Sequence, residues 1–333
     1  MAMKDAPRRD GAAWYRLVRQ QLLLPLAIAA LFTGPRVLAQ QAAPARPNLE
    51  GTWNGATLTP LQRPADFKDK AAFTPEEAAE YVRTAPDRVL NRLPSAADRL
   101  TQADIDDRFV ETEAYRLDGL RTSLIVDPAN GMLPPLLPAA TARIAARPKR
   151  SFDDPETFSL SERCLLGNFG VGGSTASPPM IPSEVIPGYY QIVQTDAYVL
   201  IFTEWIHDAR IIRLNGTHSL PSLKKWLGDS IGHYEGDTLV VDTINFRSES
   251  HNLDSGERLH VVERFSRVDA TTLRHRVTVD DPDTWTTSWT AEWPLRASNA
   301  PLYGVDCHEG NYAIENFLRG ARAEEQRAKT PPR

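Results

Sequence analysis

Short runs in which apolar and polar residues alternate follow one another from Tyr190 to Leu295, with turn-forming residues between them. A period of two residues is typical of strands with one buried face, and the short connections indicate an antiparallel meander. The clearest strand runs from Thr238 to Phe246 and is rich in β-branched residues. The pattern predicts a mainly β fold in which the meander forms a barrel or a curved sheet.

Two segments of this meander carry the side chains of most interest. The segment from Val199 to Asp208 is largely apolar on both faces, so we predict that a strand from Tyr198 to His207 crosses the middle of the protein. The last strand is predicted from Trp285 to Leu295, and alternation places its tryptophans on a single face. That aromatic row faces either a core or a ligand cavity.

Helical signals occur on both sides of the meander. Thr74-Pro75-Glu76-Glu77 combines an N-cap residue, a proline at the first helical position and a glutamate three residues after the cap. It predicts a helix from Pro75 to about Val82. Two more helices are expected near residues 87–93 and 101–114, and we interpret residues 74–120 as a helical insertion over the β core.

The end of the chain has helical spacing of its apolar residues. This spacing predicts a C-terminal helix from Ala313 to about Ala328, packed against the outside of the sheet. Residues 49–330 are therefore interpreted as a single β domain with one helical insertion.

The amino terminus has the order of a signal peptide. Basic residues precede an apolar run from Leu22 to Phe32, and small residues stand before Gln40, which predicts cleavage near Ala39. The run is shorter than the roughly 20 residues that span a bilayer, although a retained N-terminal anchor is the alternative. Residues 40–48 then form a flexible leader. We expect a periplasmic or secreted protein with no membrane span in the mature chain.

The mature chain is acidic. Removal of residues 1–39 takes away six basic and two acidic side chains, which changes the formal net charge from −5 to −9. Little basic charge is left to follow a phosphate backbone, so nucleic acid and anionic membrane surfaces are poor candidate partners. The oligomeric state is not predicted.

The two cysteines, Cys164 and Cys307, both lie in the exported part of the chain. In an oxidising compartment we expect them to form a disulfide. The sequence has no CxxC motif, no GxSxG elbow and no Rossmann, P-loop or haem-attachment motif. Thiol-redox chemistry and conventional hydrolase chemistry are therefore disfavoured, and no cofactor is expected.

Two sets of residues resemble known groups of proteins. Gly51-x-Trp53 resembles the opening strand of lipocalin-like (calycin) barrels, in which the Trp plugs one end, although the long interval before the meander departs from a simple lipocalin. Four strings resemble a large, uncharacterised family of exported bacterial proteins over residues 49–323. They are Trp226-Leu227-Gly228-Asp229-Ser230, Glu235-Gly236-Asp237-Thr238-Leu239-Val240-Val241-Asp242, Val262-Glu263-Arg264-Phe265 and Cys307-His308-Glu309-Gly310-Asn311-Tyr312. This second resemblance implies a shared fold and supplies no reaction and no catalytic residues.

Two groups of titratable residues are candidates for acid-base chemistry. Glu204, His207 and Asp208 lie together at one end of the central strand, where an imidazole beside a carboxylate can transfer protons. His308 and Glu309 follow Cys307 and could assist. The alternative for the first group is a cluster of ion pairs at the barrel rim, and for the second a role in capping the next helix. A metal site would need a third ligand, for which His207, His251 or His260 are candidates, and we predict none because no ligand spacing supports it.

Aromatic and polar side chains of the meander are candidates for ligand binding. Glu263 and Arg264 are neighbours on a strand, so only one of them can face inward, and an ordinary cross-strand ion pair is the alternative. An inward charge among tryptophans would suit a polar group on an aromatic ligand. The full candidate set is Trp205, Arg210, Trp226, Asp242, Asn245, Glu263, Arg264, Trp285, Trp289, Trp293 and Tyr312.

Three functions are compatible with these patterns. The leading hypothesis is an exported, cofactor-independent enzyme that transfers protons on a small apolar or aromatic molecule, as a lyase, hydratase or isomerase does. The rival is a periplasmic lipocalin-like protein that binds a hydrophobic small molecule, in which the tryptophan row forms the site and the histidines are structural. The third is a cell-envelope interaction module with a filled core.

Overall fold

The computed structural model describes residues 46–85, 116–147, 151–166, 176–182, 188–204, 206–250, 254–304 and 306–329. All of these belong to one compact unit, residues 44–333. The predicted signal peptide and the predicted helices near residues 87–93 and 101–114 lie outside the described ranges.

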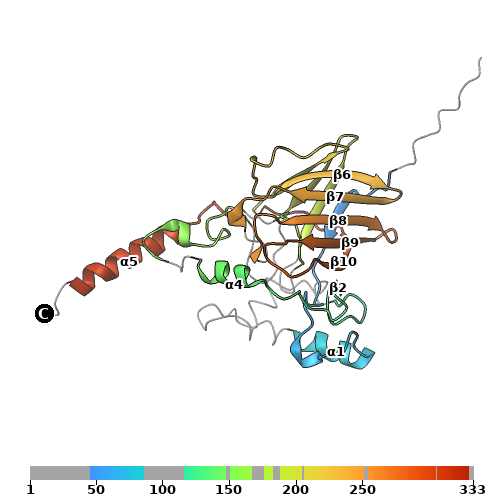
Figure 1. The fold of residues 1–333 in the computed structure, drawn as a ribbon, viewed down its shortest axis with the longest axis horizontal. Coiled ribbons are helices and arrows are strands. Elements are labelled where there is room, and N and C mark those ends of the chain that lie inside the picture. Colours follow the sequence, from blue (N-terminus) through green and yellow to red (C-terminus); the bar gives the residue numbers. More distant parts are fainter. Residues whose placement is uncertain are drawn as a thin grey trace, which may run out of the picture. The chain divides into compact units, whose positions relative to one another are not determined.

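Nine strands close into a β-barrel. The barrel strands are β1 (Gly51–Asn54), β3 (Tyr189–Gln194), β4 (Tyr198–Thr203), β5 (Ala209–Leu214), β6 (Asp229–Glu235), β7 (Thr238–Ile244), β8 (His260–Arg267), β9 (Thr272–Asp280) and β10 (Trp289–Ser298). They are paired in this order, and β1 closes the ring because it pairs with both β3 and β10. The short strand β2 (Ile125–Asp127) pairs with β10 at Thr290 and Ala291. It lies on the same edge of β10 as β1, which pairs with residues 296–298. Figure 1 shows the strands of one barrel wall, β6 to β10, side by side. The predicted mainly β fold is confirmed, and the closed barrel is consistent with a lipocalin-like architecture.

One pair of neighbouring strands departs from the antiparallel meander. β5 and β6 are parallel through Arg213 with Ile231 and Leu214 with Gly232. Asn215, whose φ is 53°, does end β5 as its turn-forming type suggests. The chain does not form a hairpin there, because residues 215–228 must cross back before β6 can start in the same direction.

The strand predicted to reach His207 ends earlier. β4 ends at Thr203, and β5 begins at Ala209. Ile206 and His207 have φ values of 57° and 53°, which lie outside the extended region of backbone conformation. The predicted extension of the strand to His207 is therefore wrong, and Ile206 and His207 belong to a turn.

The aromatic row of the last strand lies in the barrel interior. β10 starts at Trp289 rather than at Trp285, and its Trp289, Ala291, Trp293 and Leu295 are all fully buried. Trp285 makes an isolated bridge to Leu136 and packs edge-on against Trp289, with ring centroids 5.8 Å apart. These residues belong to one apolar cluster formed by side chains from β1, β3 to β5 and β7 to β10. A side chain with no accessible surface adjoins no space the size of a water molecule, so the row is packed core here.

Charged groups are also buried inside the barrel. Glu263 forms an ion pair with Arg210, and its other oxygen lies 3.1 Å from Nε2 of His275. Arg210 also donates to the hydroxyls of Ser230 and Thr243, each at 3.0 Å. Glu263 is thus the inward member of the Glu263-Arg264 pair.

The network sets the ionisation of its members. Burial alone would raise the pKa of Glu263, but the charge of Arg210 and the hydrogen bond with His275 lower it to about 2. Burial lowers the pKa of His275, whose ring stacks on Phe265 with centroids 4.2 Å apart. Both lowered pKa values are consistent with a neutral His275 that donates its Nε2 proton to a charged Glu263.

Helix α1 (Pro75–Arg83) matches its prediction. The Thr74 hydroxyl accepts from the amide of Glu77, and the Glu77 carboxylate accepts from the amide of Thr74, which completes the capping box. Tyr81 packs on Phe73, at a centroid distance of 5.0 Å, in a small apolar cluster separate from the barrel core. Helix α4 (Pro138–Ala145) was not predicted. Three-residue 3-10 helices occur at Ala65–Phe67, Pro155–Thr157 and Ser248–Ser250.

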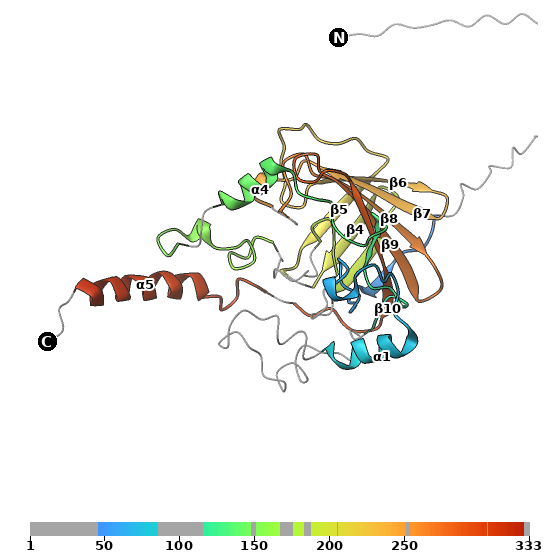
Figure 2. The ribbon, with the colours of Figure 1, turned by 60° about the horizontal axis from the view of Figure 1, so that its bottom comes forward.

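The C-terminal helix α5 (Ala313–Lys329) confirms the predicted element, but its packing differs from the expectation. It has no buried residue, and its Phe317 ring contacts the rings of Phe152 and Phe158. Arg322 pairs with Asp153 at 2.7 Å. The helix thus lies beside residues 151–158 rather than on the sheet, as Figures 1 and 2 both show.

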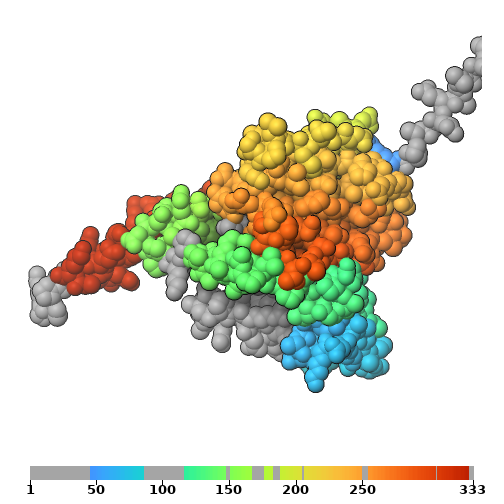
Figure 3. Space-filling model, viewed as in Figure 1, coloured from blue at the N-terminus to red at the C-terminus, as the bar shows by residue number. Residues whose placement is uncertain are grey.

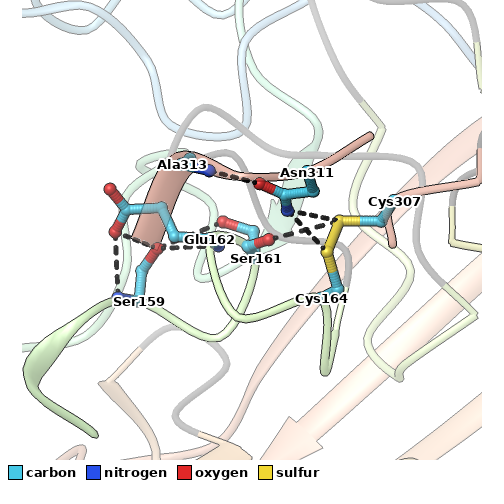
Figure 4. Close-up of a disulfide and its surroundings, with 7 residues drawn as sticks. All are labelled: Ser159, Ser161, Glu162, Cys164, Cys307, Asn311 and Ala313. Atoms are coloured by element: carbon cyan, nitrogen blue, oxygen red, sulfur yellow. Dashed lines mark hydrogen bonds between the residues drawn. A yellow bond between two sulfur atoms is a disulfide. The ribbon is translucent and has the colours of Figure 1, made fainter. Parts of the chain in front are cut away.

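The expected disulfide between Cys164 and Cys307 is present, with the two Cα atoms 5.6 Å apart. Asn311 connects it to the C-terminal helix (Figure 4), because its side-chain nitrogen lies 3.1 Å from Sγ of Cys164 while its oxygen accepts from the amide of Ala313. Disulfides persist in oxidising compartments, which fits an exported protein.

Replacing Glu263 with Gln should strongly destabilise the barrel. The substitution leaves Arg210 charged and buried without its counter-ion, which costs about 3–5 kcal/mol of unfolding free energy in comparable sites. Chemical denaturation monitored by tryptophan fluorescence measures this loss. Glu235→Gln removes a matched but exposed carboxylate that pairs with Arg264, and it should change stability little. Equal stability of the two variants would contradict the assigned role of Glu263.

The same variant should alter the acid stability of the protein. Because folding lowers the pKa of Glu263 from 4.5 to about 2, its stabilising contribution is complete above pH 4.5 and is lost as the pH falls toward 2. The unfolding free energy of Glu263→Gln should therefore fall less steeply than that of wild type across this interval.

Removing the disulfide should lower stability through the unfolded state. The bond joins residues 143 positions apart, and chain-entropy estimates for loops of this size reach about 4–5 kcal/mol. The double variant Cys164→Ser and Cys307→Ser should therefore have a lower midpoint of denaturation than oxidised wild type. Reduced wild type is the control and should match the variant. Equal midpoints for oxidised and reduced wild type would refute this expectation.

Candidate functional site

His207 and Glu204 are both held by the segment that precedes the disulfide. Nδ1 of His207 lies 2.7 Å from Oδ1 of Asp306, and Glu204 accepts a hydrogen bond of 2.8 Å from the amide of Tyr303. The carboxylate that orients His207 is therefore Asp306. Asp208 takes part in the turn through its carbonyl, which accepts from the amide of Thr203. Trp205 lies outside the described residues.

His308 and Glu309 are exposed in the turn that follows Cys307. The amide of Glu309 donates to the carbonyl of Asp306, so these residues share a turn with the partner of His207. The amide of Ala313, in the first turn of α5, donates to the side-chain oxygen of Asn311 rather than to a group of His308 or Glu309. Tyr312 is exposed.

The residues predicted to bind a ligand lie in separate places. Glu263, Arg210 and the tryptophans of β10 are inside the barrel, whereas Arg264 is on the outer wall beside Glu235. The ring of Trp226 lies under the guanidinium of Arg247, 4.5 Å from its carbon, and Asn245 donates to the carbonyl of Ser219. On the outer wall, Asp242 is the member of this set that lies beside two histidines.

A chain of alternating carboxylates and imidazoles runs across the outer wall of the barrel. Nδ1 of His218 lies 3.2 Å from Asp229, and its Nε2 lies 2.9 Å from Oδ1 of Asp242. The second oxygen of Asp242 lies 3.1 Å from Nε2 of His260. We call Asp229, His218, Asp242 and His260 the histidine cluster. Asp242 is its centre, because it binds one imidazole with each oxygen.

The strand register explains why these residues meet. Val241 and Thr243 face the interior, so Asp242 of β7 faces outward, and His260 is outward at the start of the neighbouring strand β8. His218 comes from residues 215–228, the segment that makes the parallel connection between β5 and β6. The amide of Lys225 donates to the carbonyl of Asn245, which fixes this segment against the end of β7.

Asp229 is the anchor of the cluster. Its side chain is 0% exposed, and it bonds Arg213, the ammonium of Lys225 and both the amide and the hydroxyl of Ser219. Burial would raise the pKa of Asp229, but these hydrogen bonds outweigh it and hold the pKa far below its ordinary value. Asp229 therefore stays charged and keeps His218 in place.

The other end of the cluster is open to solvent. The side chains of Asp242 and His260 are 36% and 38% exposed. The hydrogen bond with His260 lowers the pKa of Asp242, and the same bond raises the pKa of His260 against the opposing effect of burial. Among the described residues, no hydrogen bond forms to Nδ1 of His260. A half-exposed imidazole that is oriented by a carboxylate can exchange a proton with a bound molecule.

Sequence reasoning missed this arrangement. Asp229 was not among the candidate site residues, His260 appeared only as a possible metal ligand, and His218 was not singled out. The spacing of the four residues follows no motif, because the cluster depends on the crossover of residues 215–228. In the described parts of the chain, no group of three or more His, Cys, Asp or Glu residues is arranged to hold a metal ion.

Comparisons with protein-family models, with curated proteins and with solved structures find no match to this chain. The resemblance to a family of exported bacterial proteins therefore stays a prediction. Within the described residues, the structure contains no helix with the length and apolar character of a membrane span.

Replacing Asp242 with Asn should lower the pKa of His260. The substitution removes the negative charge and the acceptor that favour the protonated imidazole. NMR titration of the imidazole resonances measures the change. Glu235→Gln is the matched control, since Glu235 bonds the exposed His233 on the same wall at 3.1 Å. An unchanged His260 titration in Asp242→Asn would contradict the proposed coupling.

Proposed function

We propose that the protein is an exported, cofactor-independent enzyme that transfers protons on a small apolar or aromatic molecule, as a lyase, hydratase or isomerase does. The observation that carries this proposal is the pairing of a half-exposed His260 with Asp242, which itself bonds a second histidine. This arrangement supplies an oriented base, a counter-charge for its protonated form and a fixed support behind them.

In the proposed reaction, Nδ1 of His260 removes a proton from the bound molecule while Nε2 donates to Asp242. The imidazolium that results lies beside a carboxylate, so its formation is favoured over that of an isolated imidazole. The same nitrogen then returns the proton, either to another atom of the substrate in an isomerase or to the leaving group in a lyase. General acid-base catalysis of this kind contributes about 10²–10⁴-fold to rate.

The residues predicted from the sequence offer a second position for the same chemistry. His207 is oriented by Asp306 and is exposed as a residue, with Glu204, Asp208, His308 and Glu309 on the same or adjoining turns. We favour the histidine cluster because it contains two imidazoles and a buried anionic anchor. The His207 pair joins one imidazole to one half-exposed carboxylate, and neither a second histidine nor a buried carboxylate bonds to it among the described residues.

The rival proposal is a binding protein for a hydrophobic small molecule. The closed barrel is compatible with such a function. However, Trp289 and Trp293 are fully buried by other side chains of the core, so a ligand in the barrel would have to displace that packing. This observation favours a site on the outer wall over one in the interior.

Conversion assays with histidine variants test the proposal. The mature protein is incubated with a bacterial metabolite extract in D2O, and mass spectrometry detects compounds that are converted or that gain deuterium from solvent. We expect His260→Ala and Asp242→Asn to lose conversion by about 100-fold or more. The control His233→Ala, which changes an exposed histidine of the same wall, should retain it.

Each alternative has its own outcome in this assay. Loss of conversion in His207→Ala but not in His260→Ala would transfer the catalytic role to the His207–Asp306 pair. A compound that co-purifies with wild type and with every variant, unchanged in mass, would overturn the enzyme proposal and favour the binding protein.

A further inference from the structure

Two adjoining hollows lie on the outer wall of the barrel, and helix α1 lines the larger of them. The larger is open, has a volume of about 620 Å³, and is lined by Ala78, Ala79, Val82, Arg83, Arg116, Leu117, Gly119 and Arg296. The smaller, of about 270 Å³, is lined by Asn54, Ala56, Arg116, Thr271, Thr272, Arg296 and Ala297. Arg116 and Arg296 line both. We call the two hollows together the groove.

The barrel supplies the floor of the groove. Arg296 of β10 is the register partner of Asn54 in β1 and of Thr272 in β9. These three side chains therefore share one face of the sheet, opposite to the face that carries Trp293 and Leu295. In Figure 3, α1 lies below the orange wall of β9 and β10, with the chain that follows residue 116 between them.

The position of Arg116 is fixed by backbone hydrogen bonds. Its carbonyl accepts from the amide of Leu58 at 2.8 Å, and the amide of Asp118 donates to the hydroxyl of Thr59 at 2.8 Å. Residues 116–118 are thereby held against the chain that follows β1. Arg116 and Arg296 thus come from segments far apart in sequence and reach the same groove.

Among the described residues at and beside the groove, arginines outnumber carboxylates. Arg121, Arg274 and Arg276 pair with the two local carboxylates, Asp118 and Glu292. Within the described ranges, Arg116 and Arg296 form no ion pair, although the charge of Asp118 acts on Arg296. An excess of this kind is unexpected in a chain whose formal net charge is −5.

Arg296 lacks a full set of partners. Its Nη1 atom is buried and makes no hydrogen bond among the described residues. Burial lowers the pKa of Arg296, and the nearby charges of Arg116 and Arg274 act in the same direction, whereas Asp118 opposes them. A buried guanidinium nitrogen without an acceptor is costly, and a bound anion would relieve that cost.

We propose that the groove binds a small amphiphilic anion with a carboxylate or phosphate head and an apolar chain. The head bonds Arg116 and Arg296, since guanidinium groups match the geometry of both oxyanions. The apolar chain lies along Ala78, Val82 and Leu117. This site is separate from the histidine cluster, and the proposal does not depend on the proposed reaction.

Calorimetric titration with short amphiphiles tests this site. The mature protein is titrated with octanoate, octyl phosphate, octanol and inorganic phosphate. We expect octanoate or octyl phosphate to bind at one saturable site, and octanol and inorganic phosphate to bind at least about tenfold more weakly, because each has only half of the recognised chemistry. Whichever of the two anions binds more tightly identifies the head group. Binding of the anions should weaken as salt is added.

Arginine variants locate the binding. Arg296→Met and Arg116→Met should each weaken the binding of octanoate or octyl phosphate by about tenfold or more, since each removes a charged donor. Arg276→Met is the matched control, because Arg276 is in the same sheet, pairs with Glu292 and lies outside the groove lining. Thermal unfolding of each variant shows whether it is folded, and the exposed Arg116 gives a second test if Arg296→Met is unstable.

Two results would overturn the site. Equal affinity of wild type and both groove variants for the anions would place any binding elsewhere. Equal affinity of wild type for octanol and octanoate would show apolar adsorption without recognition of the head group.

Discussion

The ion pair between Arg210 and Glu263 determines what the interior of this barrel can be. Two charges removed from water cost several kcal/mol each, and they are tolerated only when geometry and further hydrogen bonds compensate them. Here His275, Ser230 and Thr243 complete the set, and Phe265 and Trp293 pack around the imidazole. The pair also connects β5 to β8, two strands that are not neighbours in the sheet. It therefore favours a single arrangement of the walls around a filled interior.

Because the interior is filled, the outer surface is the favoured place for a binding site. Both of the sites that we propose are on outward faces of strands, where side chains alternate with those of the core. The histidine cluster uses β6, β7 and β8, and the groove uses β9, β10 and β1. In each case a segment that is not part of the barrel provides the remaining groups. Residues 215–228 bring His218 to one site, and α1 with residues 116–119 completes the other.

The sequence predicted those features that depend on local patterns. The alternation in β10, the cap at Thr74 and the helical spacing after Ala313 each depend on neighbouring residues, and each predicted element is present. Export was also predicted from local signals, and the disulfide fits an exported protein. The extension of a strand through Ile206 and His207 was wrong, because those residues adopt positive φ although neither is a glycine.

The candidate sites could not be predicted in the same way. His218 meets Asp242 only because β5 and β6 are parallel, and no local pattern records the direction of a crossover. Arg116 and Arg296 are 180 positions apart in the chain and share a groove only after the barrel has closed. The partners of His207 were misjudged for a related reason, since Asp306 reaches it from the far end of the chain.

The closure of the barrel by β1 and β10 has a consequence for how the chain reaches this fold. Synthesis proceeds from the amino end, so the strand at Gly51–Asn54 emerges long before its partner at Trp289–Ser298. Until then an open sheet exposes an unpaired edge, to which the backbone of another chain can bind. The nascent protein must therefore remain unfolded, or be protected by a chaperone, until nearly all of it has left the ribosome.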